Sequence, residues 1–342
     1  MASTTATNPD IIQAPPPGSP ATTPLFLIHD GGGTVVSYHS MSQIQRPVYG
    51  ISNPNFDSGD PWEGGIPEMA AVYAGLIHKT VATKGFPVKR RYGQRLKILL
   101  GGWSLGGVLS LEIAHLLRTD DKLEVVGIVM VDSLYPEHPK SDKIVVTKMP
   151  EPGPRATTPQ RRSHRCMGLA SEMLGRYSPP AIWKEDLSRA SSQDTAPAPS
   201  QDSLPLAPED SPSTTAPTSP TFAPQEPSTS FDSTPATSRA ASPIWGLDSL
   251  SSSIESIDAA VPPPIILLKA KNTMFPRAHA LISAVDLYRD DPALGWGQHN
   301  SGLVKKVIEL EGNHFDLFEK PRINGTSNSL RVACTMLEEG AV

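Results

Sequence analysis

The segment Gly102-Trp103-Ser104-Leu105-Gly106 places one serine between two glycines, after an apolar run and before a run with helical periodicity. A serine at such a strand-to-helix turn, a nucleophile elbow, has strained backbone angles that lift its hydroxyl above the sheet. The two glycines avoid clashes with neighbouring backbone. A hydroxyl exposed in this way attacks acyl carbonyl groups when a base removes its proton. We therefore predict that Ser104 is the nucleophile of an acyl-transfer site.

A serine nucleophile needs an imidazole within hydrogen-bond distance, and the sequence offers nine histidines. His314, in Gly312-Asn313-His314-Phe315, follows the last predicted strand, where the chain order serine, acid, histidine places the base. Other candidates lie inside the helix after the serine or before the last strand: His115, His279 and His299. His29, at the end of the first strand, is interpreted as a residue that lines the site. The predicted base is His314.

The acid of such a site orients the imidazole and stabilises its charged form, so it belongs at the carboxyl end of a neighbouring strand. Asp132 closes the strand after the elbow helix, 28 residues beyond Ser104. Many hydrolases place the acid one strand later, but there this sequence has Lys271 and Asn272. Asp132 is the predicted acid, and Asp286 is a distant second candidate.

The tetrahedral intermediate needs two backbone N–H donors, one from the residue after the nucleophile and one from the loop after an early strand. Leu105 and the glycine run, with Gly31 and Gly32, are the predicted oxyanion-hole residues. A glycine run also occurs in phosphate-binding loops, but this one lacks both the P-loop pattern and the dinucleotide-binding spacing.

Short apolar runs alternate with segments of helical periodicity along most of the chain. Predicted strands cover 24–29, 47–52, 96–100, 123–131, 264–270 and 303–310. Predicted helices cover 66–84, 105–117 and 328–337, with weaker helical patterns at 166–177 and 180–187. This alternation predicts a mostly parallel sheet flanked by helices, and the serine elbow within it indicates an α/β-hydrolase fold.

The composition divides the chain into an ordered core and polar excursions. Residues 191–243 contain 11 Pro, 12 Ser and 8 Thr among 53 positions, too few apolar groups to offset the entropy of ordering. We expect a disordered tail over 1–21, a hydrolase core over 22–140 and 262–342, and a lid region over 141–261 that contains the disordered segment 191–243. Trp183 and Trp245 in the lid, with Trp103 beside the serine, are candidate substrate contacts.

Charge and cysteine content exclude several classes of function. A net charge of -5 and a pI near 6.0, without a long Lys/Arg block, argue against a nucleic-acid partner. Two cysteines far apart support neither a disulfide framework nor a thiolate metal site, and no metal is expected. The N-terminus lacks a secretory signal and no run of about 18 apolar residues occurs, so we expect a soluble, cytoplasmic protein without membrane contact.

Four motifs together resemble the thioesterase domains of fungal polyketide and nonribosomal peptide synthases, over about 22–140 and 262–342. They are Leu27 to Gly33, Gly102 to Gly107, Asp132-Ser133, and Gly312 to Asp316. The resemblance implies an enzyme that hydrolyses or cyclises an acyl chain held on a carrier protein's phosphopantetheine arm. It implies a free-standing enzyme that serves a carrier protein in trans, and no cofactor of its own. The Ser/Thr/Pro segment and the glycine run, in place of a frequent proline, depart from the family pattern.

Our hypothesis is a serine thioesterase of secondary metabolism in which His314, backed by Asp132, deprotonates Ser104. A carboxylesterase or lactonase acting on oxygen esters fits the same residues. A catalytically silent hydrolase fold, or a scaffold that docks through the Ser/Thr/Pro segment, is a further alternative. The sequence leaves open the acyl chain, the choice between hydrolysis and cyclisation, and the oligomeric state.

Overall fold

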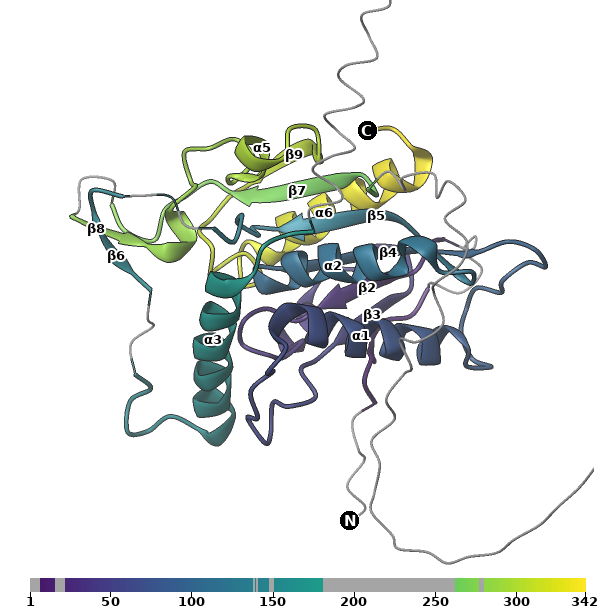
Figure 1. Cartoon of the computed structure of the whole chain (residues 1–342), viewed down its shortest axis with the longest axis horizontal. Helices are drawn as coiled ribbons and strands as arrows, with labels where there is room; N and C mark the ends of the chain where they lie inside the picture. The colour runs from purple at the N-terminus through teal and green to yellow at the C-terminus, as the bar shows by residue number, and fades with distance from the viewer. Residues whose placement is uncertain are drawn as a thin grey trace, which may run out of the picture. The chain divides into compact units, whose positions relative to one another are not determined.

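Runs of buried aliphatic residues form a seven-stranded sheet in the computed structural model (Figure 1). The structure describes residues 7–15, 22–137, 139, 141–147, 151–180, 262–276 and 280–342. The predicted disordered segment 191–243, Trp183, Trp245 and His279 lie outside these residues. The strand order is β1-β3-β2-β4-β5-β7-β9. Six strands are parallel, and β1 pairs antiparallel with β3 at one edge. The sheet therefore agrees with the predicted α/β-hydrolase class.

The strands of this sheet are β1 (Asp10–Gln13), β2 (Leu25–Ile28), β3 (Val48–Ile51), β4 (Leu96–Trp103), β5 (Leu123–Val131), β7 (Ile265–Ala270) and β9 (Val304–Leu310). A separate two-stranded sheet consists of β6 (Ile144–Val146) and β8 (Leu281–Ser283). The α-helices are α1 (Gly65–Val81), α2 (Leu105–Leu116), α3 (Thr158–Arg176), α5 (Trp296–His299) and α6 (Ile323–Glu339). Short 3-10 helices are η1 (Val36–Ser40), η2 (Leu117–Thr119) and η3 (Ala284–Asp286).

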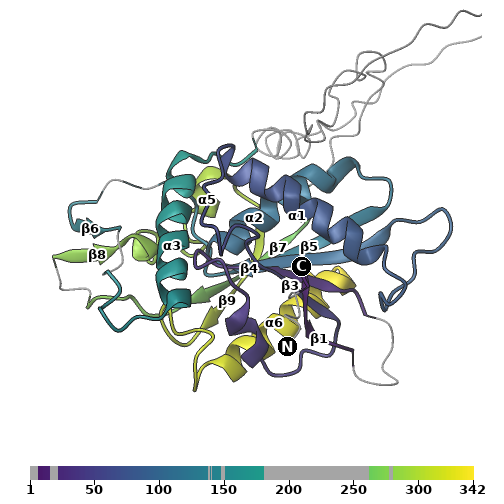
Figure 2. The same cartoon turned by 90° about the horizontal axis from the view of Figure 1, so that it is seen from below.

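Helices cover both faces of the sheet, which explains why its central strands are apolar on both sides (Figure 2). Alternate residues of β2 point to opposite faces: Phe26 and Ile28 pack with α1 and α2, whereas Leu25 and Leu27 pack with η1 and α6. Each face of the sheet therefore has its own buried cluster.

The strands before and after the long excursion belong to one sheet. β5 pairs with β7 from Ile128↔Ile265 to Val131↔Leu268, and β7 pairs with β9 up to Ala270↔Leu310. The carboxyl ends of β2, β4, β5, β7 and β9 consequently meet at one edge of the sheet, where ligands of parallel α/β folds bind.

The N-terminal tail is one place where the structure differs from the sequence prediction. Residues 10–13, predicted to be disordered, form the edge strand β1. The buried side chain of Gln13 donates to the carbonyls of Met41 (3.3 Å) and Ser42 (3.0 Å) and accepts the Ile44 N–H (3.0 Å). Because β1 is attached through the polar side chain of Gln13, it lacks the apolar pattern from which a strand is predicted.

Helix α3 is a second difference. Its 19 residues begin eight positions before the weak helical pattern at 166–177. Thr157 and Gln160 form a capping box at its start. Its only fully buried side chains are Cys166 and Ala170, so its apolar periodicity is faint. Helix α6 also begins earlier than predicted, at Ile323, and β4 continues through the glycine pair to Trp103.

No helix in the described parts of the chain combines the length and apolar composition needed to cross a bilayer.

Candidate active site

Ser104 occupies the sharp turn between β4 and α2. Its backbone angles, φ 56° and ψ -117°, are strained for a residue with a side chain, and its N–H donates to the Val131 carbonyl (2.8 Å). A Cβ atom at Gly102 would contact the backbone of Gly106, and one at Gly106 would clash with the carbonyl oxygen of Ile28. The glycines thus allow the close approach that holds the serine at the carboxyl edge of the sheet.

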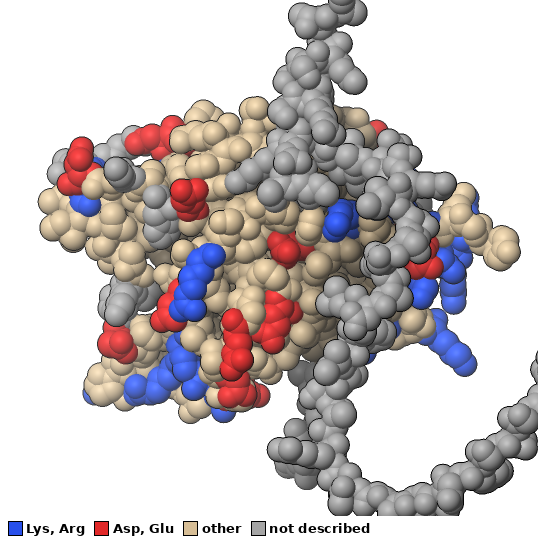
Figure 3. Space-filling view, viewed as in Figure 1, with Lys and Arg blue, Asp and Glu red and all other residues tan. Residues whose placement is uncertain are grey.

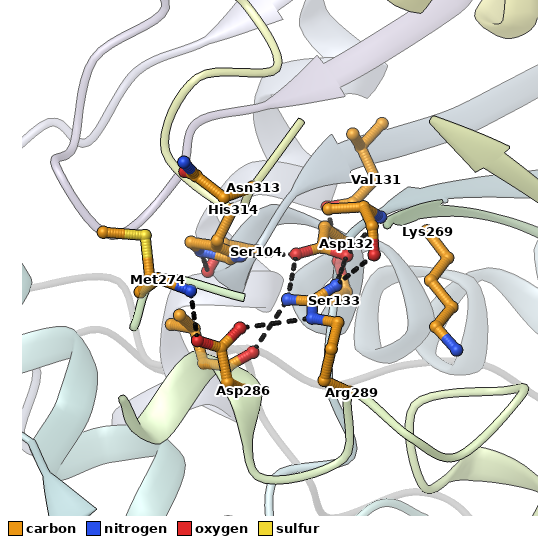
Figure 4. A network of polar contacts seen from close by, with 12 residues as sticks. Ser104, Val131, Asp132, Ser133, Lys269, Met274, Asp286, Arg289, Asn313 and His314 are labelled. Atoms are coloured by element: carbon orange, nitrogen blue, oxygen red, sulfur yellow. Dashed lines mark hydrogen bonds and ion pairs between the residues drawn. The ribbon is translucent and has the colours of Figure 1, made fainter. Parts of the chain in front are cut away.

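His314 lies between the serine and an acid (Figure 4). Its Nε2 is 3.1 Å from the Ser104 hydroxyl oxygen, and its Nδ1 is 2.8 Å from Asp132 Oδ2. Because an ionised carboxylate only accepts, Nδ1 carries the proton and Nε2 accepts from the serine hydroxyl. The ring is buried and packs against Trp103 and Phe315, with centroids 5.8 and 4.9 Å away.

Asp132 is fully buried at the end of β5. Its carboxylate accepts hydrogen bonds from His314, from the Ala270 N–H (2.7 Å) and from two nitrogens of Arg289. Burial would raise its pKa, but the hydrogen bonds from His314 and Arg289 hold the pKa well below its ordinary value. The carboxylate therefore stays charged while it orients the imidazole.

Asp286, the second candidate for the acid, does not contact His314 in the structure. It accepts the Met274 N–H (2.7 Å) and pairs with Arg289 (3.2 Å). Arg289 could not be predicted from the sequence, because a single buried arginine within a short charged segment leaves no periodic signal.

The predicted oxyanion-hole residues lie on two facing turns, and one of them is already bonded. In the described chain, neither the Leu105 N–H, the first amide of α2, nor the Gly31 N–H donates to another protein group. The Gly32 N–H instead donates to Asp30 Oδ1 (2.9 Å). Its prediction as an oxyanion donor is therefore wrong for this conformation, because a side chain of the same loop occupies it.

Comparison with known proteins gives the family. A model of the thioesterase domain matches residues 23–151. The chain is 30% identical over 324 residues to the probable thioesterase gloN of Glarea lozoyensis, covering 92% of this chain and 90% of that one. It belongs to the thioesterase family. It is also 40% identical over 169 residues to thioesterase frbD of a Dothideomycetidae species, covering 48% and 58% of the two chains.

A third relative of the thioesterase chain is much longer. The nonribosomal peptide synthetase imqB of Aspergillus flavus is 37% identical over 191 residues, which are 53% of this chain and 5% of the synthetase. The resemblance to thioesterases of fungal synthases, predicted from four motifs, is confirmed.

Two of the thioesterase's predicted substrate residues serve the protein interior instead. His29 is buried, and its ring nitrogens contact the Asp30 carbonyl and the Tyr73 hydroxyl (2.6 Å). Burial lowers its pKa to about 4, so it is neutral near pH 7. Trp103 is 7% exposed and packs against His314 and Phe318. It supports the imidazole and has little surface left for a substrate.

Helix α3, from the predicted lid region, packs over the glycine run. A Cβ atom at Gly33 would lie 3.1 Å from Cys166 Sγ, and one at Gly31 would lie 3.5 Å from the Ala170 Cβ. After α3, the Tyr177 hydroxyl donates to Glu112 of α2 (2.6 Å). Helix α3 therefore covers the thioesterase site on the side of the loop that follows β2. Figure 3 shows acidic and basic side chains interspersed over α3 and α1.

Proposed function

We propose that this chain is a serine thioesterase that releases an acyl, polyketide or peptidyl chain from a carrier-protein phosphopantetheine thioester in secondary-metabolite biosynthesis. The observation that carries the proposal is the unbroken series of hydrogen bonds from Ser104 through His314 to Asp132 at the elbow. This arrangement supplies a nucleophile, a base and an acid that are joined by hydrogen bonds.

In the first step, Ser104 Oγ attacks the thioester carbonyl carbon while His314 Nε2 takes the hydroxyl proton. The Leu105 and Gly31 N–H groups stabilise the oxyanion that forms. The carbon–sulfur bond then breaks, and the departing thiolate receives the proton from the imidazolium. The products are a free phosphopantetheine thiol and an acyl ester on Ser104.

In the second step, a water molecule or a hydroxyl or amine of the bound chain gives its proton to His314 and attacks the ester. The proton returns to Ser104 Oγ as the ester bond breaks. Water gives a free acid, and an internal nucleophile gives a ring. The enzyme needs no cofactor of its own for either route, because the protein supplies every proton transfer.

The carrier protein is proposed to act in trans. The chain matches a segment that makes up 5% of a nonribosomal peptide synthetase, and its curated relatives of similar length are thioesterases. These similarities support a free-standing enzyme that receives its substrate from a separate synthase.

A fluorophosphonate probe and a matched substrate pair test the proposal. The probe should label Ser104, and Ser104→Ala should abolish labelling, whereas Ser110→Ala in the following helix α2 should retain it. Asp132→Asn should slow labelling by about 10³- to 10⁴-fold because it disfavours the active tautomer. An acyl-pantetheine should react faster than its oxygen ester. Unlabelled wild-type protein would contradict a serine enzyme, and preference for the oxygen ester would favour a carboxylesterase.

A further inference from the structure

A buried ion pair stands behind the acid of the site (Figure 4). Arg289 Nη1 lies 2.6 Å from Asp132 Oδ1 and Nη2 lies 2.8 Å from Oδ2, so the guanidinium holds both carboxylate oxygens. Its Nε lies 3.2 Å from Asp286 Oδ1. All three side chains are at most 2% exposed. Arginine is the residue whose planar fork fits a carboxylate in this two-pronged way.

The net charge of these three side chains affects how well the site stabilises the His314 imidazolium. An arginine bonded to the acid cancels the negative charge that stabilises the imidazolium. Asp286 restores that charge, so Asp132, Arg289 and Asp286 together carry a net charge of about -1 when ionised. Burial opposes the charge on Arg289, but its bonds to Asp132 and the charge of Asp286 raise its pKa, so it stays protonated.

Two further ionisable groups lie on other elements. Asp30, from the loop after β2, has a pKa that burial raises and that the nearby His314 lowers. Lys269, on β7, acts on Arg289 and Asp132, and its Nζ donates to the Asp291 carbonyl (2.7 Å). Neither group bonds directly to the three side chains of the cluster in the described structure, so variants of Arg289 and Asp286 leave both in place.

We infer that Arg289 and Asp286 are positioning residues that work as a pair: Arg289 fixes the orientation of the acid, and Asp286 returns the negative charge that this arginine cancels. The inference rests on the proposed function, since it assigns a role behind the Ser104–His314–Asp132 triad. Asp286 thus acts on the base through charge, without a contact to it.

The test measures the rate of fluorophosphonate labelling of the full-length chain against pH. Asp286→Asn is nearly isosteric and keeps an acceptor for the Met274 N–H. The acidic limb is the pH range over which the labelling rate rises to its plateau. Loss of the Asp286 charge should move this limb to lower pH by about 0.5–1 unit, because the imidazolium is less stabilised, and should lower the plateau rate. Arg289→Gln should move the limb to higher pH. The double variant should bring the limb back to the wild-type position, because the net charge is restored.

Two controls separate charge from geometry. Arg289→Lys keeps the charge but cannot hold both oxygens, so the limb should stay in place while the plateau rate falls by about tenfold. Asp290→Asn changes the charge by the same amount next to Arg289, but this side chain is exposed, and solvent screening should leave the limb unmoved.

The outcomes distinguish the two proposals. If Asp286→Asn only lowers the melting temperature and leaves the limb unmoved, the charge-balancing role is wrong and the proposed function stands. Equal shifts in Asp286→Asn and Asp290→Asn also overturn the role. If wild-type protein is not labelled on Ser104, the proposed function itself fails. Should Arg289→Gln not fold, Asp286→Asn and its control decide the question.

Discussion

Asp30 places an ionisable carboxyl in the same loop as the proposed oxyanion donor Gly31. Burial raises its pKa to about 6, against the lowering effects of the Gly32 N–H and of His314. The folded chain therefore binds a proton that the unfolded chain releases between about pH 3.8 and pH 6. Below this pH range the Asp30 carboxyl is protonated and does not lower the free energy of unfolding. As the pH rises through the range, the buried carboxyl loses its proton and the free energy of unfolding falls.

Asp30→Asn should remove that cost. We expect the free energy of unfolding to rise by about 1–2 kcal/mol at pH 7.5 and to change little at pH 4. Urea unfolding at the two pH values measures the difference. Asp60→Asn, at an exposed carboxyl, is the matched control and should show no such pH dependence. An equal gain for Asp30→Asn at both pH values would show that the carboxyl is not the cause.

At the residue scale, the sequence predicted which groups meet but not how they are bonded. Ser104, Asp132 and His314 follow strand ends in a fixed chain order, so topology alone brings them together. Arg289 and the occupied Gly32 N–H depend on how side chains fold back within loops. Local composition contains no signal for such contacts.

The elbow depends on how closely the first turn of α2 approaches the end of β2. Gly106→Ala should lower the free energy of unfolding by about 1–3 kcal/mol, because the added methyl would overlap the Ile28 and His29 carbonyl oxygens. Gly75 lies in the middle of α1, where an added Cβ atom would meet no other atom within 4 Å. Gly75→Ala should therefore raise the free energy of unfolding by about 0.5–1 kcal/mol. Thermal unfolding of both variants tests the prediction. It would be refuted by similar effects at the two positions.

The hydrogen bond from the Tyr177 hydroxyl to Glu112 connects the residue after α3 to α2. Burial raises the pKa of Glu112, so removing its partner leaves a carboxyl that is poorly solvated. Tyr177→Phe should destabilise this attachment by about 1–2 kcal/mol. Hydrogen exchange should become faster in α3 and stay unchanged in β5. Uniform acceleration in both elements would mean that the bond stabilises the whole fold rather than α3 alone.

Elements with an apolar face could be predicted from the sequence, and those held by polar contacts could not. The strands β2, β4, β5 and β7 are buried on both sides and appear as short aliphatic runs. The strand β1 and the first half of α3 bury few apolar side chains. Their positions come from a buried glutamine and a capping box, which single-sequence periodicity does not detect.

The whole molecule completes its sheet across the long excursion. Deleting residues 191–243 should leave the melting temperature and the Ser104 labelling rate unchanged, because every strand of the sheet and all three triad side chains lie elsewhere. The remaining residues 181–190 and 244–261 still join the two halves. A change in acyl-chain preference would support the predicted lid role of the region. A lower melting temperature would show that the deleted residues stabilise the core.

The 210 positions between Ser104 and His314 also set the delay between synthesis of the proposed nucleophile and synthesis of its base. A ribosome adding about 5–20 residues per second needs about 10–40 s to make the chain between them. During that time β4, β5 and the elbow exist on the nascent chain without the imidazole, and β9 has not yet joined β7. On the proposed function, newly made protein therefore carries an unreactive serine until His314 has been made.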